Sequence, residues 1–124
     1  MAKPGNVIGW KLDLGERETL LGRFPPRYER PIADHITLAT KAESKPLPPP
    51  VNGAILGRAD DDAGVEAMVV ALNGSTDRPD GSTFHITWSL GPGRRARESN
   101  AAIRDRGWAR FDGAVPVTLI PARF

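Results

Sequence analysis

Residues 83–90 read Thr-Phe-His-Ile-Thr-Trp-Ser-Leu, and a Gly-Pro-Gly turn follows them. The β-branched and aromatic residues of this stretch predict a strand. Successive side chains of a strand point to opposite faces, so His85 and Thr87 share one face while Ile86 takes the other. By the same alternation we expect Trp88 to share the inward face of Ile86. The stretch therefore predicts a strand with a core side and a side that presents an imidazole and a hydroxyl.

The same His-Ile-Thr triplet recurs at residues 35–37, within a stretch, 35–40, that also alternates and also predicts a strand. The chain has two histidines, and each is the first residue of one triplet. If Ile36 and Ile86 both enter the core, each imidazole and its hydroxyl face away from it. Two such strands side by side would surround one cleft with two imidazoles and two hydroxyls.

The remaining elements follow from hydrophobic patterning and from glycine and proline signals. Further strands are predicted at residues 7–12, 52–58, 66–72 and 115–120, and short helices at 15–22 and 98–106. Pro116, near the start of the last strand, indicates an edge position. The proline-rich stretch 41–50 predicts an extended surface connection. Mixed strands with two short helices indicate an α+β fold, in a single domain that spans residues 1–124.

The composition limits the classes of function. A chain of 124 residues can bury one modest core. The absence of cysteine excludes disulfides, thiolate metal sites and a thiol nucleophile. The net charge of +2 suits a phosphate-bearing ligand but is too weak for gripping a long duplex. No apolar run is long enough to span a membrane and residues 1–6 lack a signal-peptide core, so we expect a cytoplasmic protein with neither a membrane nor a protein partner.

The paired triplets suit cleavage of a phosphodiester by in-line attack. One imidazole can take a proton from the attacking water or hydroxyl, and the other can give a proton to the leaving oxygen on the opposite side. Hydroxyls can donate hydrogen bonds to the non-bridging oxygens and hold the phosphorus in line. We therefore predict His35 and His85 as catalytic residues. We predict Thr37 and Thr87 as phosphate-binding residues, and we expect neither a metal nor another cofactor.

Other interpretations of the same residues stay open. A His-x-Thr triplet on a strand is commonly a surface histidine or a hydrogen-bonded core histidine. Two histidines could also bind zinc, with further ligands from scattered acids that have no recognisable spacing. A serine hydrolase would need a Gly-x-Ser-x-Gly elbow, which is missing, and it would leave the second histidine unused. The acidic run at 60–62 is typical of a turn, because adjacent side chains diverge and no EF-hand pattern follows. A module that binds a nucleotide or an RNA end with little activity is the main alternative.

The two motifs, in the contexts Pro-Ile-Ala-Asp-His-Ile-Thr-Leu at 31–38 and Thr-Phe-His-Ile-Thr-Trp at 83–88, resemble those of the 2H phosphoesterases. This superfamily includes the bacterial RNA 2′,5′-ligase-like proteins and the cyclic phosphodiesterase domains of plant and fungal tRNA ligases. The stretch Glu-Ser-Asn at 98–100 is also similar to some RNA-repair members.

The resemblance implies a bilobal fold of two antiparallel sheets with pseudo-twofold symmetry, in which each lobe gives one motif to a central cleft. It implies that His35 and His85 are catalytic, with Thr37 and Thr87 on the phosphate. It also implies a metal-independent hydrolase of 2′,3′-cyclic phosphates, 2′–5′ linkages or related cyclic nucleotides, with an RNA terminus or a nucleotide as its partner. RNA repair or processing is the expected setting.

The chain departs from the family pattern in two ways. It is shorter than typical members, which predicts one trimmed lobe and an open cleft. Asp34 stands where an apolar residue is more usual. Five residues near the motifs are candidates for contact with the substrate, with loop packing or a solvated basic turn as the alternative: Tyr28, Arg30, Arg94, Arg95 and Arg97. The sequence leaves open which histidine acts first, whether the product is a 2′- or a 3′-phosphate, and the oligomeric state.

Overall fold

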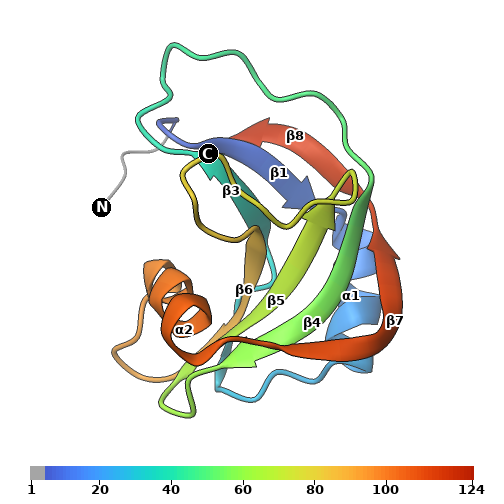
Figure 1. The fold of residues 1–124 in the computed structure, drawn as a ribbon, viewed down its shortest axis with the longest axis vertical. Helices are drawn as coiled ribbons and strands as arrows, with labels where there is room; N and C mark the ends of the chain where they lie inside the picture. Colours follow the sequence, from blue (N-terminus) through green and yellow to red (C-terminus); the bar gives the residue numbers. More distant parts are fainter. Residues whose placement is uncertain (1–4) are drawn as a thin grey trace.

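The computed structural model describes residues 5–124, so residues 1–4, part of the stretch considered for a signal peptide, lie outside it. The protein has an α+β fold, in which two short helices accompany a strongly curled antiparallel sheet (Figure 1). The strands are β1 (Ile8–Leu12), β2 (Arg30–Pro31), β3 (His35–Ala39), β4 (Gly53–Asp60), β5 (Val65–Leu72), β6 (His85–Leu90), β7 (Ala109–Val117) and β8 (Leu119–Arg123). The helices are α1 (Leu14–Arg23) and α2 (Ser99–Arg106), and a 3-10 turn at Ala96–Glu98 precedes α2. The expected α+β class is confirmed.

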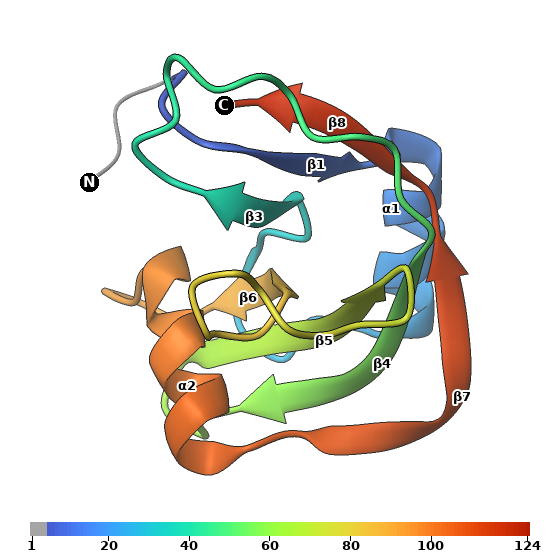
Figure 2. The ribbon, with the colours of Figure 1, turned by 45° about the horizontal axis from the view of Figure 1, so that its top comes forward.

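The sheet follows a single path, in the order β7-β4-β5-β6-β3-β1-β8, with the short β2 against β6. β7 and β8 form the two ends of this path, yet only Thr118 separates them in the chain. The sheet must therefore curl until its ends meet. Figure 2 shows this closure, with β7 rising from the side of β4 and passing into β8 beside β1.

The main core lies inside the curl. Ile36 of β3 and Ile86 of β6 are fully buried there together with Trp88, as the alternation of the two strands predicts. α1 adds Leu20 to the same cluster. Burial of large apolar side chains is the main favourable term of folding, so this cluster fixes which faces of β3 and β6 point away from the core.

Strand β5 is buried on both faces because α2 covers the face opposite to the main core. Met68 and Val70 point into the main core, while Ala67 and Val69 pack with Ile103 of α2. A strand covered on both sides needs a continuous apolar run, which is what Val-Glu-Ala-Met-Val-Val-Ala-Leu largely provides. This packing holds α2 against the half of the sheet that contains β6.

Both helices begin or end at local signals. Asp13 caps α1, since its carboxylate accepts a hydrogen bond from the backbone N–H of Glu16 at 3.0 Å. Gly107, whose φ is 71°, ends α2 in a conformation that other residues adopt only with strain. None of the helices in residues 5–124 has the length and apolar character that crossing a membrane requires.

The C-terminal region differs from the single strand predicted at 115–120, and that prediction was wrong. The chain forms two strands, β7 and β8, which meet at Thr118. The ladder between β4 and β7 shifts register near Gly57, and the extra residues of β7 include Gly113, whose φ is 98°. Such a bulge interrupts the alternation of side chains, so no hydrophobic period marks the first half of β7. Pro116 does lie in an edge strand, as expected.

Candidate functional site

The two His-Ile-Thr triplets lie side by side, on the neighbouring antiparallel strands β3 and β6. Ile36 pairs with Ile86 in the ladder, and both side chains are fully buried. One step along this register, each histidine lies across from the threonine of the other triplet. The polar side chains of both triplets therefore leave the sheet on the face opposite to the two isoleucines.

A pocket of about 210 Å³ opens on this face. It is lined by the histidines and threonines of both triplets, by Arg78 and Arg97, and by Asn100 of α2. The volume has room for a phosphate group and the atoms bonded to it. The lining brings together imidazoles, hydroxyls and guanidinium groups, which are the groups that bind a phosphate and move protons around it.

His85 is the more buried histidine, with 8% of its surface exposed. Its Nδ1 lies 2.8 Å from the carbonyl oxygen of Thr83. Because a carbonyl can only accept a hydrogen bond, Nδ1 carries the proton and Nε2 keeps its lone pair. Burial lowers the pKa of His85 below its ordinary 6.5, against the opposing hydrogen bond to Thr83, and the charge of Arg78 lowers it further. At neutral pH His85 is a neutral imidazole that can accept a proton.

His35 has different partners. Its Nδ1 lies 2.9 Å from Oδ2 of Asp34, and the same oxygen accepts a hydrogen bond from the Lys11 ammonium group at 2.6 Å. The ring of Phe124 packs against the imidazole, with the two centroids 4.4 Å apart. Partial burial raises the pKa of Asp34, but the hydrogen bonds from Lys11 and His35 outweigh this and hold it below its ordinary 3.8. His35 thus faces an ionised carboxylate, which can accept the Nδ1–H of the ring and orient the imidazole.

The two threonines of the triplets differ in how much hydrogen-bonding capacity they leave to a ligand. The Thr87 hydroxyl lies 2.9 Å from the Ser99 hydroxyl and 3.2 Å from the carbonyl oxygen of Ala96. Ser99 is fully buried at the start of α2, so its contact with Thr87 ties the helix to β6. The Thr37 hydroxyl has no hydrogen-bond partner within residues 5–124 and is the more available donor.

Arg78 belongs to the pocket, although nothing in the sequence indicated it. It lies in the loop between β5 and β6, and its side chain is only 9% exposed. The guanidinium group donates to Asn100 Oδ1 at 2.8 Å and to the carbonyl oxygen of Thr37 at 3.4 Å, across 41 positions of sequence. It also donates to Asp80 at 3.1 Å. A cation is therefore fixed in the wall of the pocket, between β3 and α2.

The predicted substrate-contact residues lie in two places. Arg97 lines the pocket. Tyr28 and Arg94 are engaged at the acidic turn after β4 instead: the Tyr28 hydroxyl donates to Asp60 at 2.6 Å, and Arg94 donates to Asp61 at 2.7 Å. These long side chains hold the turn in place, and the structure does not bring them to the histidines.

Arg30 and Arg95 also make their contacts away from the pocket. Arg30 donates to the carbonyl oxygen of Gly91, and the backbone N–H of Arg95 donates to Glu98, both in the segment between β6 and α2. The acidic run at 60–62 is occupied by ion pairs with arginines. Across residues 5–124, no group of three or more His, Asp or Glu side chains is arranged to hold a metal ion.

No protein-family model, no curated protein and no solved structure matches the chain. The function is therefore inferred from the pocket itself: two imidazoles with unlike partners, an available hydroxyl and a fixed guanidinium group, all on one face of two adjacent strands.

Proposed function

We propose that the protein is a metal-independent phosphoesterase, which hydrolyses a 2′,3′-cyclic phosphate, or a related cyclic or 2′–5′ phosphodiester, at an RNA end or on a nucleotide. The observation that carries this proposal is that one pocket holds two imidazoles whose Nδ1 atoms face acceptors of different charge. The acceptor is a neutral carbonyl for His85 and a carboxylate for His35. This difference supports a proton acceptor on one side of a phosphate and a proton donor on the other.

In the proposed reaction, Nε2 of His85 takes a proton from a water molecule as the water oxygen bonds to phosphorus. The bond from phosphorus to one ribose oxygen of the cyclic phosphate breaks, and that oxygen receives a proton from His35. The product is a phosphate monoester beside a free hydroxyl. His85 then carries one proton more and His35 one fewer, and exchange with solvent restores both. The buried, neutral state of His85 and the Asp34 carboxylate beside His35 support this order of roles.

The remaining polar groups of the pocket suit the phosphate. The Thr37 hydroxyl can donate to a non-bridging oxygen, and Arg78 and Arg97 place positive charge beside the negative charge that grows on those oxygens. Both proton transfers are assigned to imidazoles, so the reaction is expected to proceed with the same rate in the presence of EDTA.

We further propose that the fold has the two-lobed organisation of the 2H phosphoesterases. One lobe would contain β1, β3 and β8, and the other β4 to β7, so that each lobe gives one triplet to the pocket. The support for this is the narrow junction between β3 and β6, where Ile36 pairs with Ile86. A local twofold axis through that pair relates one triplet to the other.

The test is turnover of nucleoside 2′,3′-cyclic phosphates in buffer that contains EDTA, followed by chromatography of the monophosphate product. His35→Ala and His85→Ala should each lower kcat/KM by about 10²–10⁴-fold. The double variant should be scarcely worse than either single variant, because the two groups act in one step.

A surface change, Lys45→Ala, serves as the control, since this residue is exposed and does not line the pocket. It should leave turnover unchanged. The absence of turnover by the wild-type protein, or equal turnover by wild type and both histidine variants, would contradict the proposal.

A binding module that uses the same cleft with little activity is the second candidate function. The engagement of the Thr87 hydroxyl by Ser99 and Ala96 favours it, because one of the two phosphate donors is then already occupied. Calorimetry distinguishes the candidates: the module binds a nucleoside 2′,3′-cyclic phosphate and releases it unchanged.

A further inference from the structure

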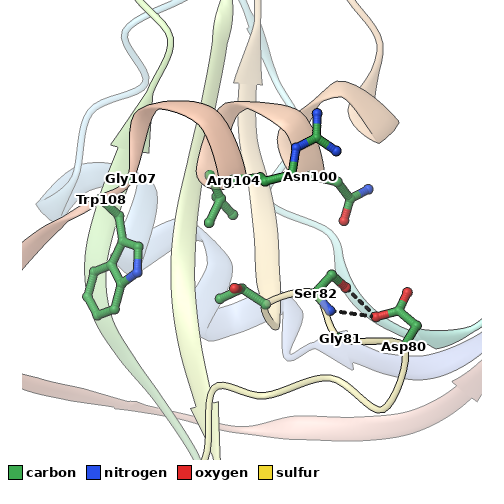
Figure 3. A pocket seen from close by; sticks show the side chains of 9 residues that line it. Asp80, Gly81, Ser82, Asn100, Arg104, Gly107 and Trp108 are labelled. Carbon is green, nitrogen blue, oxygen red and sulfur yellow. Dashed lines mark hydrogen bonds between the residues drawn. The ribbon is translucent and has the colours of Figure 1, made fainter.

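A second cavity adjoins the histidine pocket, and it is the larger of the two, with a volume of about 420 Å³. It lies between α2, the loop that leads into β6, and Trp108 (Figure 3). Asn100 of α2 lines both cavities. The two cavities therefore lie next to each other at the side chain of Asn100.

Hydrogen bonds also join the walls of the two cavities. Thr83 lines the larger one, and its carbonyl oxygen accepts the Nδ1–H of His85 at 2.8 Å. Asp80 lines it too, and its carboxylate accepts a hydrogen bond from Arg78 at 3.1 Å. The loop thus presents one set of residues to each cavity, and hydrogen bonds link the two sets.

Trp108 differs from the other two tryptophans. Trp10 and Trp88 are buried, and their indole N–H groups donate to backbone carbonyls at 3.0 and 2.8 Å. Trp108 is only partly buried, and its indole N–H has no hydrogen-bond partner within the part of the chain that the structure describes. Figure 3 shows the nitrogen-bearing edge of this indole on the side of the other lining residues. The cavity therefore has an aromatic wall with an available donor.

The position of the indole is set by packing. A Cβ atom at Gly57 would lie 2.5 Å from Cε3 of Trp108, so the absence of a side chain there lets the ring lie against β4. Ile103 of α2, which packs in the same cluster, forms an apolar part of the cavity wall. The ring is thus held in place without using its N–H group, which leaves that group for a ligand.

The opposite wall supplies an acceptor. Oδ1 of Asp80 accepts from the backbone N–H of Ser82 at 3.0 Å and from Arg78, and Figure 3 shows the bonds to Ser82. The hydrogen bonds from Ser82, together with Arg78, lower the pKa of Asp80 to about 2, so the group is an ionised carboxylate at neutral pH. Within residues 5–124, Oδ2 has no hydrogen-bond partner. It can accept from an N–H group of a ligand.

We propose that this cavity, with Trp108 on one wall and Asp80 on the other, binds the nucleobase of the nucleotide whose phosphate lies at the histidines. The inference rests on the proposed function, which places the phosphate. A nucleobase is a flat heterocycle that offers acceptors to the indole N–H, N–H donors to the carboxylate and an apolar face to Ile103. This combination matches the walls described above.

Calorimetry with two probes separates the base from the phosphate: adenosine 2′-monophosphate, and 1-O-methylribose 2′-phosphate, which lacks the base. The wild-type protein should bind the nucleotide about 10-fold or more tightly than the base-free probe. In Trp108→Ala this preference should fall to about 2-fold or less, while the affinity for the base-free probe stays the same. Trp108→Phe keeps an aromatic ring against Gly57 but lacks the N–H, and it should lose part of the preference.

Arg106→Gln is the control, because Arg106 is an exposed residue of α2 that lines neither cavity. It should bind both probes as the wild type does. Equal affinity of the wild type for the two probes, or an undiminished preference in both Trp108 variants, overturns the inference and leaves the proposed function standing. If neither probe binds the wild-type protein, the proposed function fails and the nucleobase site fails with it.

Discussion

The two histidines come from identical triplets, yet the protein surrounds them differently. His85 is almost completely buried and donates to the backbone carbonyl of Thr83. His35 has a side chain that is 30% exposed, and it faces the carboxylate of Asp34. Burial favours the neutral form of His85, whereas His35 has an anionic neighbour. A repeated motif thus gives two similar positions, and their neighbours make those positions chemically unlike.

The largest expected effect tests whether this difference assigns the roles of base and acid. In a nucleoside p-nitrophenyl phosphate the leaving group departs without a proton, so a general acid is not needed. His35→Ala should therefore lose about 10²–10⁴-fold in kcat/KM on a 2′,3′-cyclic nucleotide and only a few-fold on the aryl ester. His85→Ala should lose activity on both substrates. Equal losses of both variants on both substrates would mean that the structural difference does not decide the roles.

An intermediate effect is expected on removing the partner that distinguishes His35. Asp34→Asn keeps the shape of the side chain but removes the negative charge that faces the His35 imidazole. The kcat/KM at the optimal pH should fall by about 10- to 100-fold. Asp105→Asn, at an exposed position on α2, is the matched control and should have no effect.

The pH profile of the same variant sharpens this test. The base must be neutral to act, and burial lowers the pKa of His85 below 6.5. Activity of the wild type should therefore persist as the pH falls through 6.5 and decline only below it. Asp34→Asn should leave this acid limb in place, since the Asp34 carboxylate bonds to the other histidine. If the decline of kcat/KM at low pH shifts to a different pH in Asp34→Asn, the two histidines do not have separate roles.

The smallest expected effect concerns the threonines of the two triplets. Thr37→Val removes an unengaged hydroxyl and should lower kcat/KM by about 10-fold with little change in stability. Thr87→Val leaves the buried Ser99 hydroxyl without this partner, so it should lower the free energy of unfolding by about 1–2 kcal/mol. Urea unfolding measures that change. Thr19→Val, on the exposed side of α1, is the control for both, and a result in which all three variants behave alike would remove the distinction.

Those parts of the site that depend on one strand could be predicted from the sequence. The alternation of a strand is local, so the residues alone placed Ile36 and Ile86 in the core and the histidines on the other face. The composition and order of elements were likewise enough for the α+β class. The sequence did not show that β3 and β6 are neighbours; it showed only that a shared pocket requires this. The order of strands in the sheet places the two side by side.

The partners of these residues could not be predicted, because they come from distant parts of the chain. Lys11 reaches Asp34 only because β1 pairs with β3. Arg78 reaches the pocket from a loop that carries no motif. Arg94, which the sequence also predicted at the site, is instead held by Asp61 of the acidic turn after β4. Which arginine lines a pocket depends on the acidic groups elsewhere that bind the same side chain. These long-range contacts cannot be derived from a single sequence.

The closure of the sheet by β8 has a consequence for when the histidine pocket is completed during synthesis. Residues 8–12 pair with residues 119–123, and Phe124 packs against His35. Contacts between such distant residues close a long loop, which slows folding and places their formation late. During synthesis, both triplets emerge well before the strand that supports the wall beside His35. A nascent chain that stops short of residue 119 should therefore hold both histidines and still lack the proposed activity.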